Sequence, residues 1–348
     1  MSALPARRVT VRTRGLSARV DLRTVAVLSA LTLLTLALLT AHVALGETKI
    51  PPLDVLRTLA GAGDPGTDFV INELRLPRAL VAILAGAALG ITGLIFQDVA
   101  RNPLVSPEIV GVSGGASLAA VSVVVFTSWG SAATLPLAAL GGGLLTGLLL
   151  YVLAWRGGVQ GYRLVLVGIG VAAALNACVS YVLTKGEIIN VSEAWIWLVG
   201  SLNGRTWDHV WPVVIALAVL VPAALALGRQ LEALKLGDEL ARGLGVSVER
   251  SRLLLLTVAI VLTSVSVAAA GALAFVAFVA AHIARRLVPG APSSATLPIA
   301  ALCGALIVLA ADLAGRELFG STDLPAGLLT ATLAAPYFLF LLKRPTRR

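Results

Sequence analysis

Two short glycine-rich patterns resemble sites of covalent or nucleotide chemistry, but neither has the context that such chemistry needs. GVSGG at 111–115 fits the G-x-S-x-G pattern of a serine nucleophile, which follows a strand and works with a histidine and an acid. GIGVAA at 168–173 fits a dinucleotide fingerprint, which needs a βαβ unit. Both lie in apolar runs, and the sequence has no G-x-x-x-x-G-K-S/T phosphate loop. We predict that the chain is not an enzyme and does not hydrolyse ATP by itself.

Residues that ligate metals are few and scattered. His42, His209 and His282 lie far apart, and the sequence has neither an H-E-x-x-H nor a C-x-x-C motif. Cys178 and Cys303 each stand alone within an apolar run, so no disulfide framework is expected. We therefore predict no metal site and no cofactor.

The composition points to a membrane protein. Apolar residues make up 58% of the 348 residues and charged residues 13%, whereas a soluble domain has about 45–50% and about 25%. The apolar residues form long unbroken runs, which excludes a soluble enzyme, a disordered chain, a fibrous repeat and an alternating outer-membrane barrel. The sequence predicts an all-α polytopic membrane protein.

Uncharged runs give the expected spans. Val25–Leu45 follows a basic arm and is long enough to cross about 30 Å of hydrocarbon, which favours an uncleaved first span over a signal peptide. The run 253–281 is too long for one span, and basic residues flank both of its ends, so we expect a break at Gly271 and two spans. With the other runs, about ten crossings are predicted. These other runs are 79–96, 109–127, 132–154, 164–184, 210–228, 297–311 and 324–342.

The distribution of charge gives the orientation. The net charge is +9, and Lys and Arg concentrate in alternate loops, which belong on the cytoplasmic side. Both termini are then cytoplasmic, and the positive charge reflects topology and anionic lipid rather than nucleic acid. The expected organisation is a basic arm at 1–24, a ten-span domain at 25–343 with an external interfacial segment at 186–206 and an inner loop at 229–252, and a tail at 344–348.

Asp312 is the acid that this span assignment puts at membrane depth. Arg316 follows one helical turn later, so the two side chains are expected to pair. An ion-coupled secondary transporter would need acids or broken helices near the bilayer midplane. That class remains a distant alternative.

The inner loop at 229–252 has the pattern of a docking element. Gly237 is expected to join two short helices, of which Asp238 caps the second and Gly243 or Gly245 ends it. A loop that lies on the lipid surface is the alternative interpretation. The apolar side consists of Leu231, Leu234, Leu236, Leu240 and Leu244.

Several separated motifs resemble one family. The stretch LRLPRALVAILAGAALGITGLIFQDVARNPLVSPEIVGVSGGASLAAV, from Leu74, resembles the signature of FecCD-type permeases, the membrane subunits of type II ABC importers for ferric siderophores, haem and cobalamin. The matches are Arg75–Arg78, Gly86–Leu89, Gly93, Gln97, Asn102–Leu104, Pro107, Gly111 and Gly115–Ala116. Stretches at 236–252, 271–287 and from Leu297 also match. GSLNG at 200–204 is similar to the siderophore branch, particularly to enterobactin-type subunits.

The resemblance implies a type II importer permease fold in the bacterial inner membrane. It implies transport of a ferric siderophore, with haem or cobalamin as the alternative cargo. The implied partners are two ATPase subunits per complex, an external substrate-binding protein and a second permease subunit, which can be identical or merely homologous.

The resemblance also implies three sets of site residues, one of which, the cytoplasmic gate, contains Tyr162. This side chain either plugs the translocation path or anchors its helix at the membrane interface. The binding protein would dock on Arg75, Arg78 and Arg316. The cytoplasmic gate would be Asn102, Leu104, Gly161 and Tyr162, and the ATPase would couple to Leu234, Leu236, Gly237, Asp238, Glu239, Leu240, Arg242, Leu244 and Gly245.

Overall fold

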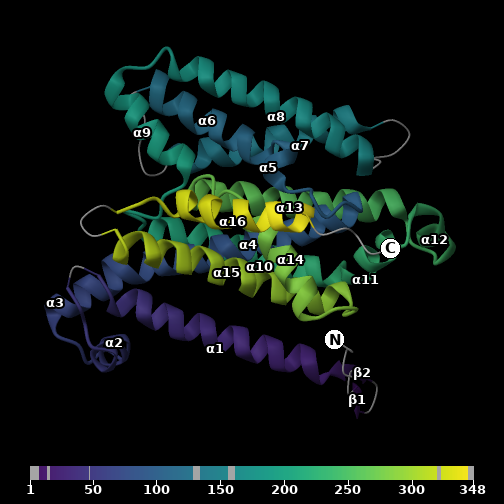
Figure 1. Cartoon of the computed structure of the whole chain (residues 1–348), viewed down its shortest axis with the longest axis horizontal. Helices are drawn as coiled ribbons and strands as arrows, with labels where there is room; N and C mark the ends of the chain where they lie inside the picture. Colours follow the sequence, from purple (N-terminus) through teal and green to yellow (C-terminus); the bar gives the residue numbers. More distant parts are fainter. Residues whose placement is uncertain are drawn as a thin grey trace.

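Long apolar helices run side by side along the long axis of the molecule (Figure 1). The computed structural model describes residues 8–13, 16–46, 48–127, 134–155, 161–319 and 323–343. Within these ranges, seven helical segments are long and apolar enough to cross a membrane. They are α1 (Leu22–Ala44), the segment Pro65–Ala100 that ends in α4 (Leu76–Ala100), α7 (Thr134–Ala154), α8 (Gly161–Leu183), α10 (Trp207–Ala226), α13 (Val248–Ala270) and α15 (Ser293–Glu317).

Three further helices, each shorter than these seven, correspond to the remaining predicted spans. They are α6 (Val112–Phe126), α14 (Val276–Leu287) and α16 (Ala326–Lys343). The break expected at Gly271 is confirmed: α13 ends at Ala270, and Gly271 has a φ of 74°, which favours glycine. Two helices therefore replace the one over-long apolar run.

Helix α4 is the centre of the bundle, and glycines let its neighbours approach. A Cβ on Gly86 would meet the carbonyl oxygen of Gly304 in α15, and one on Gly93 would meet the carbonyl oxygen of Ala277 in α14. Small residues serve close helix packing in lipid in this way. These contacts fix the positions of α14 and α15 against α4.

Short elements gather at the two ends of the bundle. At one end lie α11 (Gly228–Lys235) and α12 (Asp238–Gly243) (Figure 1). The antiparallel hairpin of β1 (Arg8–Thr13) and β2 (Leu16–Asp21), which directly precedes α1, lies at the same end. At the other lie α2 (Pro52–Leu59), α3 (Pro65–Asp68) and α9 (Ile188–Val199), with the π-helix η1 (Phe69–Arg75) between α3 and α4. Helix α9 occupies the predicted interfacial segment. The tail at 344–348 and residues 1–7 of the basic arm lie outside the described residues.

The end with α11 and α12 is called the inner end below, and the end with α2, α3 and α9 the outer end. The predicted pair of short helices at 229–252 is present, and Gly237 joins them with a φ of 107°. Between α4 and α6 the chain reverses at Asn102–Ser106 and forms one turn of helix, α5 (Pro107–Val110). Pro103 and Pro107 exclude a continuous helix there.

Candidate functional site

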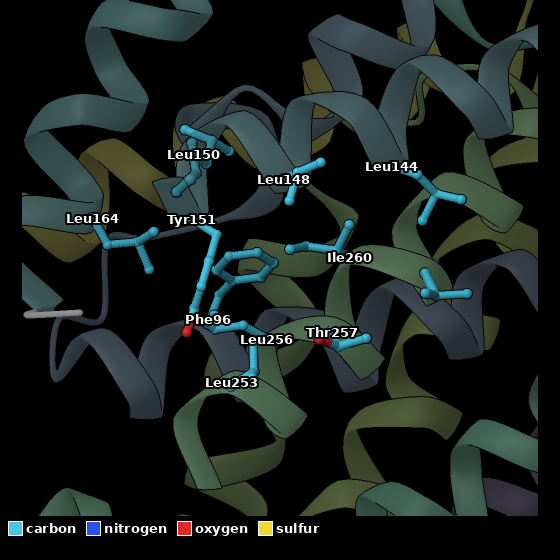
Figure 2. A pocket seen from close by; sticks show the side chains of 13 residues that line it. Phe96, Leu144, Leu148, Leu150, Tyr151, Leu164, Leu253, Leu256, Thr257 and Ile260 are labelled. Atoms are coloured by element: carbon cyan, nitrogen blue, oxygen red, sulfur yellow. The ribbon is translucent and has the colours of Figure 1, made fainter. Parts of the chain in front are cut away.

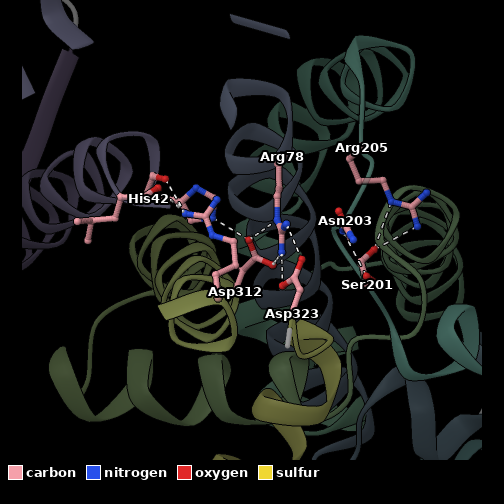
Figure 3. Close-up of polar contacts among 9 residues, drawn as sticks. His42, Arg78, Ser201, Asn203, Arg205, Asp312 and Asp323 are labelled. Atoms are coloured by element: carbon pink, nitrogen blue, oxygen red, sulfur yellow. Dashed lines mark hydrogen bonds and ion pairs between the residues drawn. The ribbon is translucent and has the colours of Figure 1, made fainter. Parts of the chain in front are cut away.

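Arg78 is the centre of a polar cluster at the outer end (Figure 3). Its Nε and Nη2 donate to the two carboxylate oxygens of Asp312 in α15, both at 2.8 Å. Its Nη1 and Nη2 also donate to Asp323, at 3.0 and 3.1 Å. Asp312 is fully buried, whereas the Asp323 side chain is 33% exposed. One guanidinium therefore joins α4, α15 and the segment that leads into α16.

Asp312 does not pair with Arg316, so that expectation is wrong. Its second partner is His42 of α1, whose Nε2 lies 2.7 Å from Asp312 Oδ2. Arg316 instead donates through Nη2 to the carbonyl oxygens of His42 and Leu45, at 2.8 and 3.2 Å. The carbonyls at a helix C-terminus lack partners within the helix, and a cation is favourable there.

Arg75 also caps the end of α1. Its Nη1 donates to the carbonyl oxygens of Val43 and Ala44, and its Nη2 donates to the carbonyl oxygen of Thr48 at 2.6 Å. The structure thus brings the three predicted docking arginines together around one helix end. Arg75 and Arg78 are each only 8% exposed, and all three guanidinium groups are engaged within the chain. Their role in docking remains a prediction.

Another arginine of the outer end lies in the segment 200–206. Arg205 donates through Nε and Nη2 to the carbonyl oxygen of Ser201, at 3.3 and 3.1 Å, and its Nη1 lies 3.2 Å from Nε2 of His209. Figure 3 shows it beside Ser201 and Asn203. Burial lowers the pKa of Arg205 to about 10. Arg205 is not among the predicted site residues; the available signal was its position directly after the GSLNG motif.

At the inner end, two of the four predicted gate residues and five of the nine predicted coupling residues line one cavity of about 520 Å³. Gly161 and Tyr162 of α8 form one part of the wall, and Arg101 at the end of α4 forms another. The Tyr162 side chain is 78% exposed there. The remaining wall is 236–240, namely Leu236, Gly237, Asp238, Glu239 and Leu240.

The other two gate residues form the turn that follows Arg101. Asn102 Oδ1 accepts a hydrogen bond from the Leu104 backbone N–H at 3.0 Å, and Leu104 is partly exposed. A Cβ on Gly161 would lie 2.8 Å from the Ala100 carbonyl oxygen, so α8 begins tightly against the end of α4. All four predicted gate residues therefore belong to the junction of α4 and α8.

The leucines of the inner loop divide into two groups. Leu231 and Leu234 are buried in the chain's own core, so Leu234 anchors α11 instead of facing a partner. Leu236, Leu240 and Leu244 are exposed by 57–64%. Glu239, Arg242 and Gly245 are exposed around them. An apolar knob with a charged rim results.

Asp238 does not cap α12, which is a second correction. The N-cap is Gly237, and no side chain caps the helix. The Asp238 carboxylate instead accepts hydrogen bonds from Arg101 of α4 and Arg252 of α13, at 3.1 and 2.8 Å. Charge-assisted bonds to two arginines are stronger than a bond to a backbone amide.

A polar network behind the cavity was not predicted. Asp98 of α4 accepts a hydrogen bond from Arg285 of α14 at 2.8 Å, and Lys235 of α11 lies 3.5 Å from its other oxygen. Glu232 accepts hydrogen bonds from Ser293 and from Lys235, which fastens α11 to the start of α15. Burial alone would raise the pKa of Glu232, but the hydrogen bonds from Lys235 and Ser293 outweigh burial and lower it.

Glu108 is a further acid within the bundle that span assignment missed. Both its carboxylate oxygens lie 3.0 Å from the backbone nitrogen of Phe275, which precedes α14. The available signal was its place between Pro107 and the apolar run 109–127. Asp312 is thus not the sole acid among the packed helices.

A cavity of about 290 Å³ between α4, α7, α8 and α13 has a different character (Figure 2). Aliphatic side chains and Phe96 line most of it, and Tyr151 and Thr257 supply the polar atoms. No charged residue lines this cavity. Such a lining does not suit a charged chelate, because a buried charge needs a partner.

Comparison with known proteins gives a consistent picture. The FecCD transport family matches residues 33–344. The chain is 40% identical over 315 residues to the probable siderophore transport system permease protein YfhA of Bacillus subtilis, covering 89% of this chain and 92% of the relative. It is 42% identical over 304 residues to the ferric enterobactin transport system permease protein FepG of Escherichia coli, covering 87% and 91%. A solved metal-chelate type ABC transporter in an inward-facing conformation is 27% identical, with a TM-score of 0.78 over 92% of this chain and 100% of that chain.

Proposed function

Because this chain belongs to the FecCD transport family, we propose that it forms part of the translocation path for a ferric siderophore in an ABC importer. Members of the family are transport subunits and not themselves catalytic. The cargo is inferred from relatives whose names specify siderophore or ferric enterobactin transport. We therefore regard the chain as a permease that depends on a separate ATPase.

The observation that carries this function is the shared cavity at the inner end. One wall comes from the gate residues Gly161 and Tyr162, and the other comes from the loop 236–240 that we expect the ATPase to contact. A movement of this loop changes the space next to the gate. An energy-coupled permease needs such a connection between the partner surface and the path.

The exposed knob of Leu236, Leu240 and Leu244 supports docking of the ATPase. These side chains present apolar surface beyond the bundle, with Glu239 and Arg242 beside them. Apolar contacts with a charged rim are typical of protein interfaces. Permeases of ABC importers work with ATPase subunits, a second permease and a binding protein. For this chain we place the ATPase at the inner end.

The outer end is the proposed surface for the substrate-binding protein. Arg75, Arg78 and Arg316 lie together there with the carboxylates of Asp312, Asp323 and Glu317, so an acidic group of a partner would compete with these carboxylates for the guanidinium groups. An acidic partner would be attracted over a distance of about one Debye length. Because the guanidinium groups are internally bonded, direct contact requires one internal bond to exchange. With this placement, the outer end faces away from the cytoplasm and both termini are cytoplasmic.

Growth on ferric siderophores as sole iron source tests the proposal. A strain that lacks this chain should lose growth on at least one siderophore, and the chain expressed from a plasmid should restore it. Leu240→Asp should not restore growth, because it places a charge in the apolar contact, and the ATPase should no longer co-purify. Intact growth without the chain, or rescue by Leu240→Asp with normal assembly, would argue against this assignment.

A further inference from the structure

One carboxylate at the inner end joins three elements. Asp238, the first residue of α12, accepts hydrogen bonds through the same oxygen from Nη2 of Arg101 and from Nη2 of Arg252. Arg101 ends α4 and directly precedes Asn102 of the predicted gate turn, whereas Arg252 belongs to the first turns of α13. The coupling loop is thus tied both to the gate turn and to a spanning helix.

The two ties differ in strength. The Arg252 side chain is 2% exposed, and Glu249 lies 3.7 Å from its Nη1. Breaking a buried ion pair strongly destabilises the folded protein, so the tie to α13 is the stronger of the two. The Arg101 side chain is 42% exposed, and solvent screens its ion pair with Asp238. The ion pair between Arg101 and Asp238 can therefore open and form again. As a result, α12 moves together with α13, and the gate turn either moves with α12 or separates from it.

The backbone of Arg101 has a conformation that the surrounding fold must stabilise. Its φ is 51°, in the left-handed region that costs energy for a residue other than glycine. The chain reverses there, and the guanidinium points across Gly237, where a Cβ would lie 3.2 Å from Arg101 Nη1. Arg101 also lines the cavity that contains Gly161 and Tyr162. Its side chain is therefore the contact between the coupling loop and the gate.

We propose that Arg101 is a positioning residue that transmits movement of α12 to the gate turn at Asn102. When the ATPase moves α12, Asp238 moves with it, and the ion pair draws Arg101 and the adjoining turn. Opening beside Tyr162 then follows ATP hydrolysis. The inference rests on the proposed function, because it needs an ATPase at α12 and a gate at Tyr162.

The test measures the gate directly and does not depend on the cargo. Tyr162→Cys is introduced together with Cys178→Ala, since Cys178 is exposed and Cys303 is buried. The permease is reconstituted with its ATPase in proteoliposomes, and the rate of thiol modification at position 162 is measured with and without ATP. Arg101→Gln removes the charge that pairs with Asp238, and the glutamine must adopt the same positive φ as the arginine. Arg101→Lys keeps a cation at this position. Arg286→Gln is the matched control, because it removes an exposed charge at the end of α14, away from Asp238.

We expect ATP to change the modification rate in the parent, in Arg286→Gln and, in part, in Arg101→Lys. In Arg101→Gln the ATP-dependent change should shrink by about two- to fivefold, which is as much coupling as a solvent-exposed ion pair supplies. Assembly and ATP hydrolysis should persist, because a screened ion pair adds little to stability. A merely structural role would reduce assembly and leave the ATP response of the assembled fraction intact.

Two results would overturn the proposal, and they differ in what else they reject. A normal ATP response in Arg101→Gln, with a responding parent, rejects the link through Arg101 and leaves the permease function standing. A parent without any ATP response rejects the gate at Tyr162 and the link together.

Discussion

Arg78 of α4 donates two parallel hydrogen bonds of 2.8 Å to the carboxylate of Asp312 in α15, which has no contact with solvent. This bidentate geometry is the strongest that an arginine and a carboxylate form. Three helices are joined at the outer end, because His42 of α1 binds the same carboxylate. The outer cluster is thus a structural clamp as well as a candidate docking surface.

We predict that Asp312→Asn destabilises the protein by about 3 kcal/mol, the lower end of the cost of breaking a buried ion pair. The cost is not higher because Asp323 still binds Arg78. Thermal unfolding in detergent measures the effect. The matched control is Asp64→Asn, since Asp64 is exposed at the same end. Equal melting temperatures for the two variants would contradict the clamp.

We predict that Asp323→Asn strengthens docking of the substrate-binding protein. Asp323 occupies the outer side of the Arg78 guanidinium, where an acidic group of the partner would bind. Removing this competitor should tighten binding by up to about tenfold, or about 1.4 kcal/mol, and added salt should reduce the gain. Glu187→Gln is the control, because it removes an exposed acid that directly precedes α9 at the same end. Equal affinities for both variants, or weaker binding by Asp323→Asn, would speak against docking at Arg78.

We predict that acid loosens the contact between α11 and α15. The pKa of Glu232 is lower in the folded chain than its ordinary value of 4.5. The stabilisation is therefore complete above that ordinary value and is lost as the pH falls through the lower folded pKa. Hydrogen exchange of a peptide that contains the Ser293 amide, whose N–H donates to Glu232 at 2.8 Å, reports the contact. In Glu232→Ala, which removes the acceptor, exchange should be fast already at neutral pH; slow exchange there would show that another contact protects the amide.

We predict that Gly93→Ala damages the packing of α4 against α14. The new Cβ would clash with the carbonyl oxygen of Ala277, and backbone must shift to accommodate it. Overpacking of this kind costs about 1–3 kcal/mol. Gly170→Ala in α8 is the control, because nothing lies within 4 Å of its new Cβ. Yield and melting temperature should fall for Gly93→Ala only; an unaffected Gly93→Ala would refute the close crossing.

The sequence predicts features that depend on neighbouring residues. The break at Gly271 and the two short helices around Gly237 follow from run length, flanking charge and glycine position, and both are present. Contacts within one helix are also visible in a sequence, and this is why Arg316 was expected to pair with Asp312. The real partners, Arg78 and His42, come from distant segments that tertiary packing brings together.

The burial of the outer arginines could not be predicted for the same reason. Positive residues near span ends ordinarily remain in contact with water. Arg75 and Arg316 are instead drawn to the carbonyl groups that end α1, and the position of α1 depends on the whole bundle. The role of Asp238 likewise depended on where α4 ends and α13 begins.

The central claim is that this permease moves a ferric siderophore only when a partner hydrolyses ATP. Uptake of ⁵⁵Fe-labelled ferric enterobactin and ferric citrate into proteoliposomes tests it most directly, with the chain reconstituted with or without its ATPase and binding protein. We predict uptake of at least one chelate that requires ATP and the ATPase, no uptake by the chain alone under a proton gradient, and no ATP hydrolysis by the chain alone. Uptake driven by the ion gradient without the ATPase, or ATP-dependent uptake of cobalamin or haem and of neither ferric chelate, would contradict it.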